Sequence, residues 1–146
     1  MDVKTLKGIL ENAISSLFVN QDNIFDFTSE TNQTEWNLAH HYANEINNLL
    51  SDFDCDLDIV KTNLGNQRPD IIFHLRGKQE SNFLVIEVKL DGSPSKLKAD
   101  IEKIKSSWFG DRLHYKFGAV VNLESNKTGQ VEVFENPSYF KENHDE

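Results

Sequence analysis

The sequence predicts an α/β fold in which helices flank a mixed central β-sheet. Two helix-like segments precede three strand-like runs, and a third helix-like segment separates those runs from two more strands. Consecutive strands joined by short loops pair antiparallel, whereas a helix between two strands is typical of a parallel crossover. With 146 residues, of which 38% are hydrophobic, the chain is large enough for one domain with a real core.

The two helices before the sheet are predicted from apolar residues at helical spacing. Such a stripe runs through residues 3–18 and defines an N-terminal helix within residues 1–19. The polar residues 20–32 are expected to form a connecting loop. A second helix is expected from about Thr34 to Leu50, with Thr34 as a plausible N-cap.

The first three strands are predicted from alternating or continuous apolar residues. Residues 54–61 alternate between polar and apolar side chains, which is typical of a half-buried strand. Two apolar runs follow, over residues 68–76 and 82–89, and the polar residues 77–80 lie between them. We therefore expect these two runs to form a hairpin with a four-residue loop.

The third helix begins with a clear capping signal and is followed by the last two strands. Ser93 is the expected N-cap and Pro94 the first-turn proline, and Gly110 ends the helix. Its apolar stripe consists of Leu97, Ile101, Ile104 and Trp108. Strands are then expected over residues 115–123 and 130–134.

We expect a single domain over residues 1–146. Its core would comprise about residues 34–135, with the N-terminal helix added before it and a frayed tail over residues 141–146. The single cysteine, Cys55, excludes an internal disulfide, and no apolar run approaches the roughly 20 residues that span a bilayer. These features favour a cytoplasmic protein without a membrane partner.

Three charged residues interrupt the apolar hairpin strands, where charge is costly unless it is paired or binds a metal. If Arg76 pairs with Ser81 across the loop, Asp70 lies directly opposite Glu87, and Lys89 shares the face of Glu87. Two carboxylates so placed need a cation between them, or one of them must hold a proton. A slip of the register by one residue would move Asp70 to the other face.

Glu35 is the fourth charged residue of interest. On a helical projection of the second helix it falls in the middle of the apolar stripe, which consists of Leu38, Ala39, Tyr42, Ile46 and Leu49. We therefore expect its carboxylate to point inward. The alternative is a first-turn residue that emerges from the core and interacts with the helix dipole.

Together these residues resemble the motif of the PD-(D/E)xK nuclease superfamily, which has the restriction-endonuclease-like fold. The elements of the motif are a helix glutamate, Pro-Asp at the start of one strand, Glu-Val-Lys at the end of the next, and then a helix. The resemblance covers roughly Glu35 to Leu123. It implies a restriction-endonuclease-like core with an extra N-terminal helix.

The resemblance also implies roles for individual residues. Asp70, Glu87 and the main-chain carbonyl of Val88 would bind Mg²⁺, for which Mn²⁺ can substitute. Glu35 would bind the metal directly or through water, and Lys89 would orient or activate the attacking water and steady the phosphate. The implied function is a metal-dependent nuclease acting on nucleic acid, with DNA as the expected substrate.

Two alternatives remain open at this point. The first is a catalytically silent domain of the same fold that acts as a binding or regulatory module. In the second, the charges pair structurally, with Lys89 bridging Glu87 or Asp70, and the protein is indifferent to metal.

The distribution of charge constrains the binding partner. The net charge of −9 argues against broad, non-specific affinity for nucleic acid. Residues 89–116, however, carry seven basic and four acidic residues, a net charge of +3. The expected contacts with the nucleic-acid backbone are Lys96, Lys98, Lys103, Lys105 and Arg112. A solvated helix face is the alternative, and binding is expected to need a homodimer, a partner protein or a restricted substrate.

Overall fold

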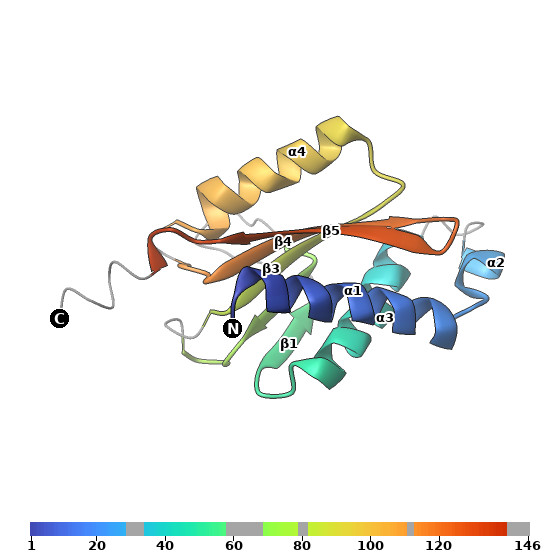
Figure 1. Ribbon diagram of the computed structural model, residues 1–146, viewed down its shortest axis with the longest axis horizontal. Coiled ribbons are helices and arrows are strands. Elements are labelled where there is room, and N and C mark those ends of the chain that lie inside the picture. Colours follow the sequence, from blue (N-terminus) through green and yellow to red (C-terminus); the bar gives the residue numbers. More distant parts are fainter. Residues whose placement is uncertain (29–33, 58–68, 79–81, 111–112, 140–146) are drawn as a thin grey trace.

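The computed structural model describes residues 1–28, 34–57, 69–78, 82–110 and 113–139. Figure 1 shows the arrangement of its helices and strands. In chain order these are α1 (Val3–Asn20), α2 (Ile24–Thr28), α3 (Thr34–Leu49), β1 (Asp54–Leu57), β2 (Ile71–His74), β3 (Leu84–Leu90), α4 (Pro94–Lys103), the π-helical turn η4 (Ile104–Trp108), β4 (Phe117–Glu124) and β5 (Thr128–Glu135).

The predicted mixed sheet is confirmed. Its five strands lie in the order β1-β2-β3-β4-β5, so every strand is hydrogen-bonded to its neighbours in the sequence. The β3–β4 pair is parallel and the other three pairs are antiparallel. Helix α4 connects β3 to β4, as a parallel pair requires.

The predicted hairpin register is also confirmed. Ile71 pairs with Ile86, and Phe73 pairs with Leu84. Asp70, one residue before β2, therefore lies opposite Glu87. The expected pairing of Arg76 with Ser81 falls partly outside the described residues.

The sheet separates two layers of helices. Helices α1 and α3 cover one face, and α4 covers the other (Figure 1). Because neighbouring side chains of a strand point to opposite faces, Ile71 and Ile86 pack in the larger core with α1 and α3, whereas Ile72 and Val85 pack with α4 and η4. Glu87 follows Val85 in this alternation and faces α4.

Helix α4 begins as predicted but ends differently. The Ser93 hydroxyl accepts a hydrogen bond from the Lys96 amide at 3.4 Å, with Pro94 in the first turn. The last turn widens into η4, where the Phe109 amide donates to the Ile104 carbonyl at 2.9 Å. An apolar stripe at helical spacing does not distinguish this wider turn from a regular one.

The segment expected to be a loop after α1 contains the short helix α2. Its Ile24 side chain is buried, and the Phe25 ring stacks on Phe18 of α1 with 5.9 Å between the ring centroids. Five residues are too few to show helical periodicity, so this helix could not be predicted from the sequence pattern.

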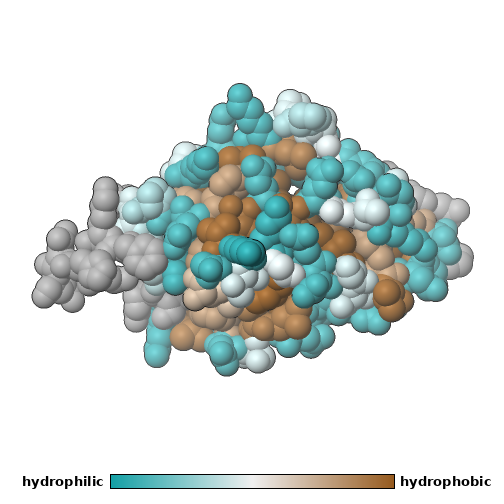
Figure 2. Space-filling model, viewed as in Figure 1, coloured by the Kyte–Doolittle hydropathy of each residue, from teal (hydrophilic) through white to brown (hydrophobic). Residues whose placement is uncertain are grey.

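The surface agrees with this layering. Figure 2 shows many hydrophilic side chains over α1 and α4, with hydrophobic surface between these helices and also in the lower part of the view. Among the described helices, none combines the length and apolar character needed to cross a membrane.

Gly118 tests the packing of η4 on β4. A Cβ atom there would lie 2.3 Å from Cγ2 of Ile104 and 3.1 Å from Cζ of Phe109. Gly118→Ala should therefore lower the free energy of unfolding by about 1–3 kcal/mol, measured by urea denaturation. The matched control is Gly8→Ala in α1, where no atom lies within 4 Å of the added carbon and helix propensity should raise stability. Equal stability of the Gly118→Ala variant and the wild type would contradict this packing.

Candidate functional site

The structure brings together the two carboxylates that the sequence placed opposite each other. Oδ2 of Asp70 accepts a hydrogen bond from the Val88 main-chain amide at 2.7 Å. This bond fixes the Asp70 carboxylate against the end of β3. The Glu87 side chain, only 4% exposed, lies beside it and also hydrogen-bonds with it.

This proximity changes the ionisation of both groups. Burial raises the pKa of Asp70, although hydrogen bonds from Val88 and the Glu87 side chain, and the charge of Lys89, act in the opposite direction. Burial and the neighbouring charge of Asp70 raise the pKa of Glu87 to about 8. Without a metal, the two carboxylates together therefore favour binding of one proton, whereas the ammonium of Lys103 favours the ionised form of Glu87.

Helix α4 supplies an oppositely charged partner for each charge on β3. Nζ of Lys103 lies 3.2 Å from Oε1 of Glu87, and Nζ of Lys89 lies 3.4 Å from Oδ2 of Asp100. Within the described part of the chain, neither carboxylate oxygen has a hydrogen bond of good geometry. Both contacts are therefore ion pairs in which the buried oxygen can still accept a further interaction.

Asp100 was not among the expected site residues, and Lys103 was expected in a different place. Lys103 was expected to contact nucleic acid, but in the structure its ammonium faces Glu87. A signal was present, since Asp100 and Lys103 lie three residues apart and directly precede Ile101 and Ile104 of the apolar stripe. Residues at this spacing share one helix face, and that face borders the stripe packed on the sheet.

Lys89 keeps its proton in this environment. Burial lowers the pKa of Lys89, but the charges of Asp100, Glu35 and Asp70 outweigh it, so that the pKa is raised. Without a bound metal, a lysine in this state supplies a positive charge to the site. Of the two roles implied for Lys89, the electrostatic one fits this geometry.

A small hydrogen-bond network positions the Lys89 side chain. Oδ1 of the buried Asn122 accepts from the Gly92 amide at 2.8 Å, and its Nδ2 donates to the Gly92 carbonyl at 3.4 Å. A Cβ atom on Gly92 would lie 2.9 Å from Cβ of Lys89. Asn122 therefore holds the β3–α4 connection against the Lys89 stem, a role that the sequence alone did not reveal.

The expected inward orientation of Glu35 is wrong. Its side chain is exposed in the first turn of α3. It still lies near enough to influence the site, because its charge contributes to the raised pKa of both Asp70 and Lys89. The first turn of a helix can extend past the edge of the sheet on which the helix packs. A residue there can be exposed although it lies on the apolar stripe.

Four of the five basic residues expected to bind nucleic acid lie within the described residues. Lys96 and Lys98 are exposed on α4, and Lys103 faces Glu87. The Lys105 ammonium lies over the Phe134 ring, 4.9 Å from its centroid. Arg112 lies outside the described residues.

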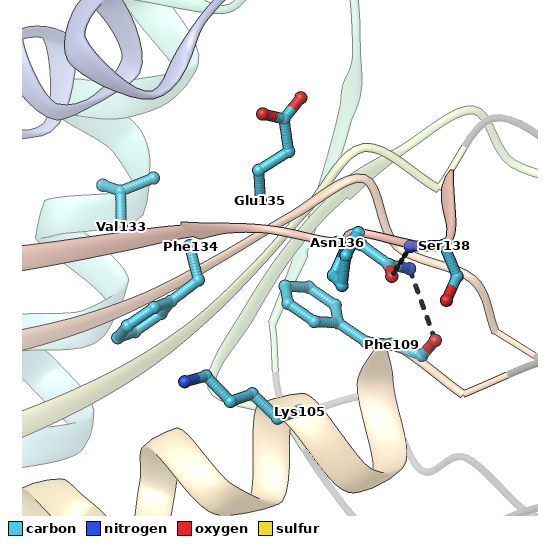
Figure 3. A pocket seen from close by; sticks show the side chains of 8 residues that line it. Lys105, Phe109, Val133, Phe134, Glu135, Asn136 and Ser138 are labelled. Atoms are coloured by element: carbon cyan, nitrogen blue, oxygen red, sulfur yellow. Dashed lines mark hydrogen bonds between the residues drawn. The ribbon is translucent and has the colours of Figure 1, made fainter. Parts of the chain in front are cut away.

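Lys105 also lines a hollow of about 570 Å³ between η4 and the end of β5 (Figure 3). Asn136 forms one wall, where its Nδ2 donates to the carbonyls of Phe109 and Tyr115 at 3.3 and 3.0 Å. Its Oδ1 accepts from the Ser138 amide at 3.0 Å. These bonds satisfy the Asn136 amide within the protein. The hollow adjoins the start of β4, whereas the charged cluster lies level with the later residues of that strand.

The donor set fits a hard divalent cation with few protein ligands. Within the described ranges, no group of three or more His, Cys, Asp or Glu side chains could hold a metal. Mg²⁺, however, is commonly bound by one or two carboxylates and several waters. Asp70 and Glu87 supply two carboxylates, and the Val88 carbonyl projects to the same side of β3 as the amide that binds Asp70.

Comparison with known proteins adds little to this geometry. No protein-family model and no curated protein matches the chain. Among solved structures, the chain is similar to one described as "Crystal structure of SSO0001", with a TM-score of 0.34 and 18% sequence identity. The match covers 79% of this chain and 62% of that chain. The site is therefore interpreted from its own geometry.

The raised pKa of Glu87 predicts a pH-dependent stability without metal. The pKa of Glu87 in the folded protein, about 8, lies above the ordinary value of 4.5. The stability that comes from this tighter proton binding is therefore fully present below about pH 4.5 and is lost as the pH rises through 8. The free energy of unfolding should fall across this window, by at most about 1.4 kcal/mol per pH unit for one proton.

Urea denaturation in the presence of a chelator, between pH 5 and 8, measures this effect. Glu87→Gln should flatten the pH dependence, while the matched variant Glu132→Gln, at an exposed position on β5, should keep the wild-type slope. The same slope in wild type and Glu87→Gln would refute the raised pKa of Glu87.

Proposed function

We propose that this protein is a metal-dependent nuclease of the PD-(D/E)xK type that hydrolyses phosphodiester bonds, with DNA as its expected substrate. The observation that carries the proposal is the contact between Asp70 and Glu87. Two buried carboxylates that raise each other's cost of ionisation destabilise a fold unless a cation joins them. A purely structural role gives no reason to keep both.

Each residue of the site has a proposed role in hydrolysis. Asp70 and Glu87 would hold Mg²⁺, together with the Val88 carbonyl. When bound, the metal supplies a polarised water and neutralises charge on the phosphate. Lys89, held as a cation by Asp100, stabilises the negative charge that develops on the phosphate. Exposed Glu35 acts on this site through its charge.

A catalytically silent module is the second candidate, and one observation favours it. Glu87 and Lys89 each have a partner of opposite charge on α4, so the β3 charges are balanced without a metal. The expected structural alternative had Lys89 bridging Glu87 or Asp70, whereas the structure pairs it with Asp100. Among the contacts described, only the one between Asp70 and Glu87 is not explained by pairing of opposite charges.

Cleavage assays on alanine variants test the proposed function. The wild type should cleave a single- or double-stranded DNA in the presence of Mg²⁺ or Mn²⁺. Asp70→Ala and Glu87→Ala should each reduce cleavage to the level without enzyme, because each removes one of only two carboxylate ligands. RNA of the same sequence tests the substrate class.

Glu132→Ala, at its exposed position on β5, is the matched control and should cleave at the wild-type rate. Circular dichroism and thermal unfolding should show that both site variants remain folded. A folded Asp70→Ala variant that cleaves normally would rule out this site, and a wild type inactive on every substrate with either metal would favour the silent module.

A further inference from the structure

The charges of β3 and α4 are arranged as two crossed ion pairs. Glu87 and Lys89 lie two residues apart on one face of β3, and Asp100 and Lys103 lie three residues apart on one face of α4. Glu87 of β3 forms an ion pair with Lys103 of α4, and Lys89 of β3 forms an ion pair with Asp100 of α4. The helix therefore balances the charge of the strand in the absence of any bound ion.

The two members of the Glu87–Lys103 pair differ in their freedom to move. The Glu87 side chain is 4% exposed and fixed between the sheet and α4, whereas the Lys103 side chain is 32% exposed. Nζ of Lys103 also lies 5.7 Å from the centroid of the Trp108 ring. The ammonium can therefore leave Glu87 for water without unfolding the protein, but Glu87 cannot leave the ammonium.

We infer that Lys103 is an exchangeable counter-ion: it pairs with the ionised form of Glu87 while no metal is present and gives up this position to the divalent cation. The inference rests on the proposed metal site. Its physical reason is that an ammonium 3.2 Å from Oε1 and a divalent cation bound to the same carboxylate repel each other strongly. Because Oε1 has no hydrogen bond of good geometry among the described residues, exchange breaks an ion pair only.

Metal titration by calorimetry tests the exchange. Lys103→Met should bind Mg²⁺ and Mn²⁺ about threefold or more tightly than the wild type, because the competing cation is gone. Lys105→Met is the matched control, since it removes the same charge from the adjoining turn η4 and should stay within about twofold of the wild type. Lys103→Arg should restore wild-type affinity.

Fluorescence of Trp108 provides a second readout that does not depend on activity. The chain has two tryptophans, and the other, Trp36, is exposed, so Trp36→Phe leaves Trp108 as the only one. Saturating Mg²⁺ should change the Trp108 emission in the Trp36→Phe variant as Lys103 moves away. The change should be absent when Lys103→Met is added, although that variant still binds Mg²⁺.

The outcomes separate this inference from the proposed function. If the wild type binds metal and Lys103→Met binds it equally or more weakly, the exchange is wrong and the metal site stands. An unchanged Trp108 emission at saturating Mg²⁺ also refutes the exchange. If no variant binds metal, the exchange and the proposed metal site are both wrong.

Discussion

The rest of the site depends on the hydrogen bond between the Asp70 carboxylate and the Val88 amide. This bond joins the start of β2 to β3 just beyond the last described pair of their ladder, and it places Asp70 directly beside Glu87. The register of the β2–β3 hairpin therefore determines how Asp70 and Glu87 lie relative to each other. A slip by one residue would break the bond and send Asp70 to the face of α1 and α3.

Helix α4 stabilises this arrangement of buried charges by charge compensation. Its Lys103 and Asp100 balance Glu87 and Lys89, and Asn122 fixes the connection that leads into the helix. Trp108 and the turn η4 then close the apolar layer beneath these charges. The charged cluster therefore lies between a sheet and a helix whose other contacts are apolar, where electrostatic interactions are stronger than in water.

The fold and the strand part of the site could be predicted because two-residue alternation and a short hairpin leave few possible registers. The expectation for Glu35 was wrong because helical periodicity describes a face and not how far the first turn extends beyond it. Asp100 was missed because a polar residue beside an apolar stripe looks the same in the sequence whether it contacts water or a half-buried lysine. Only the packing of α4 on the sheet determines whether Asp100 contacts water or Lys89.

Anomalous diffraction from crystals grown with Mn²⁺ would show whether Asp70 and Glu87 bind one divalent cation. We expect an anomalous peak in contact with both carboxylates, with the Lys103 ammonium moved away from Glu87. The absence of a peak there in crystals with saturating Mn²⁺, with Lys103 still facing Glu87, would rule out this metal site.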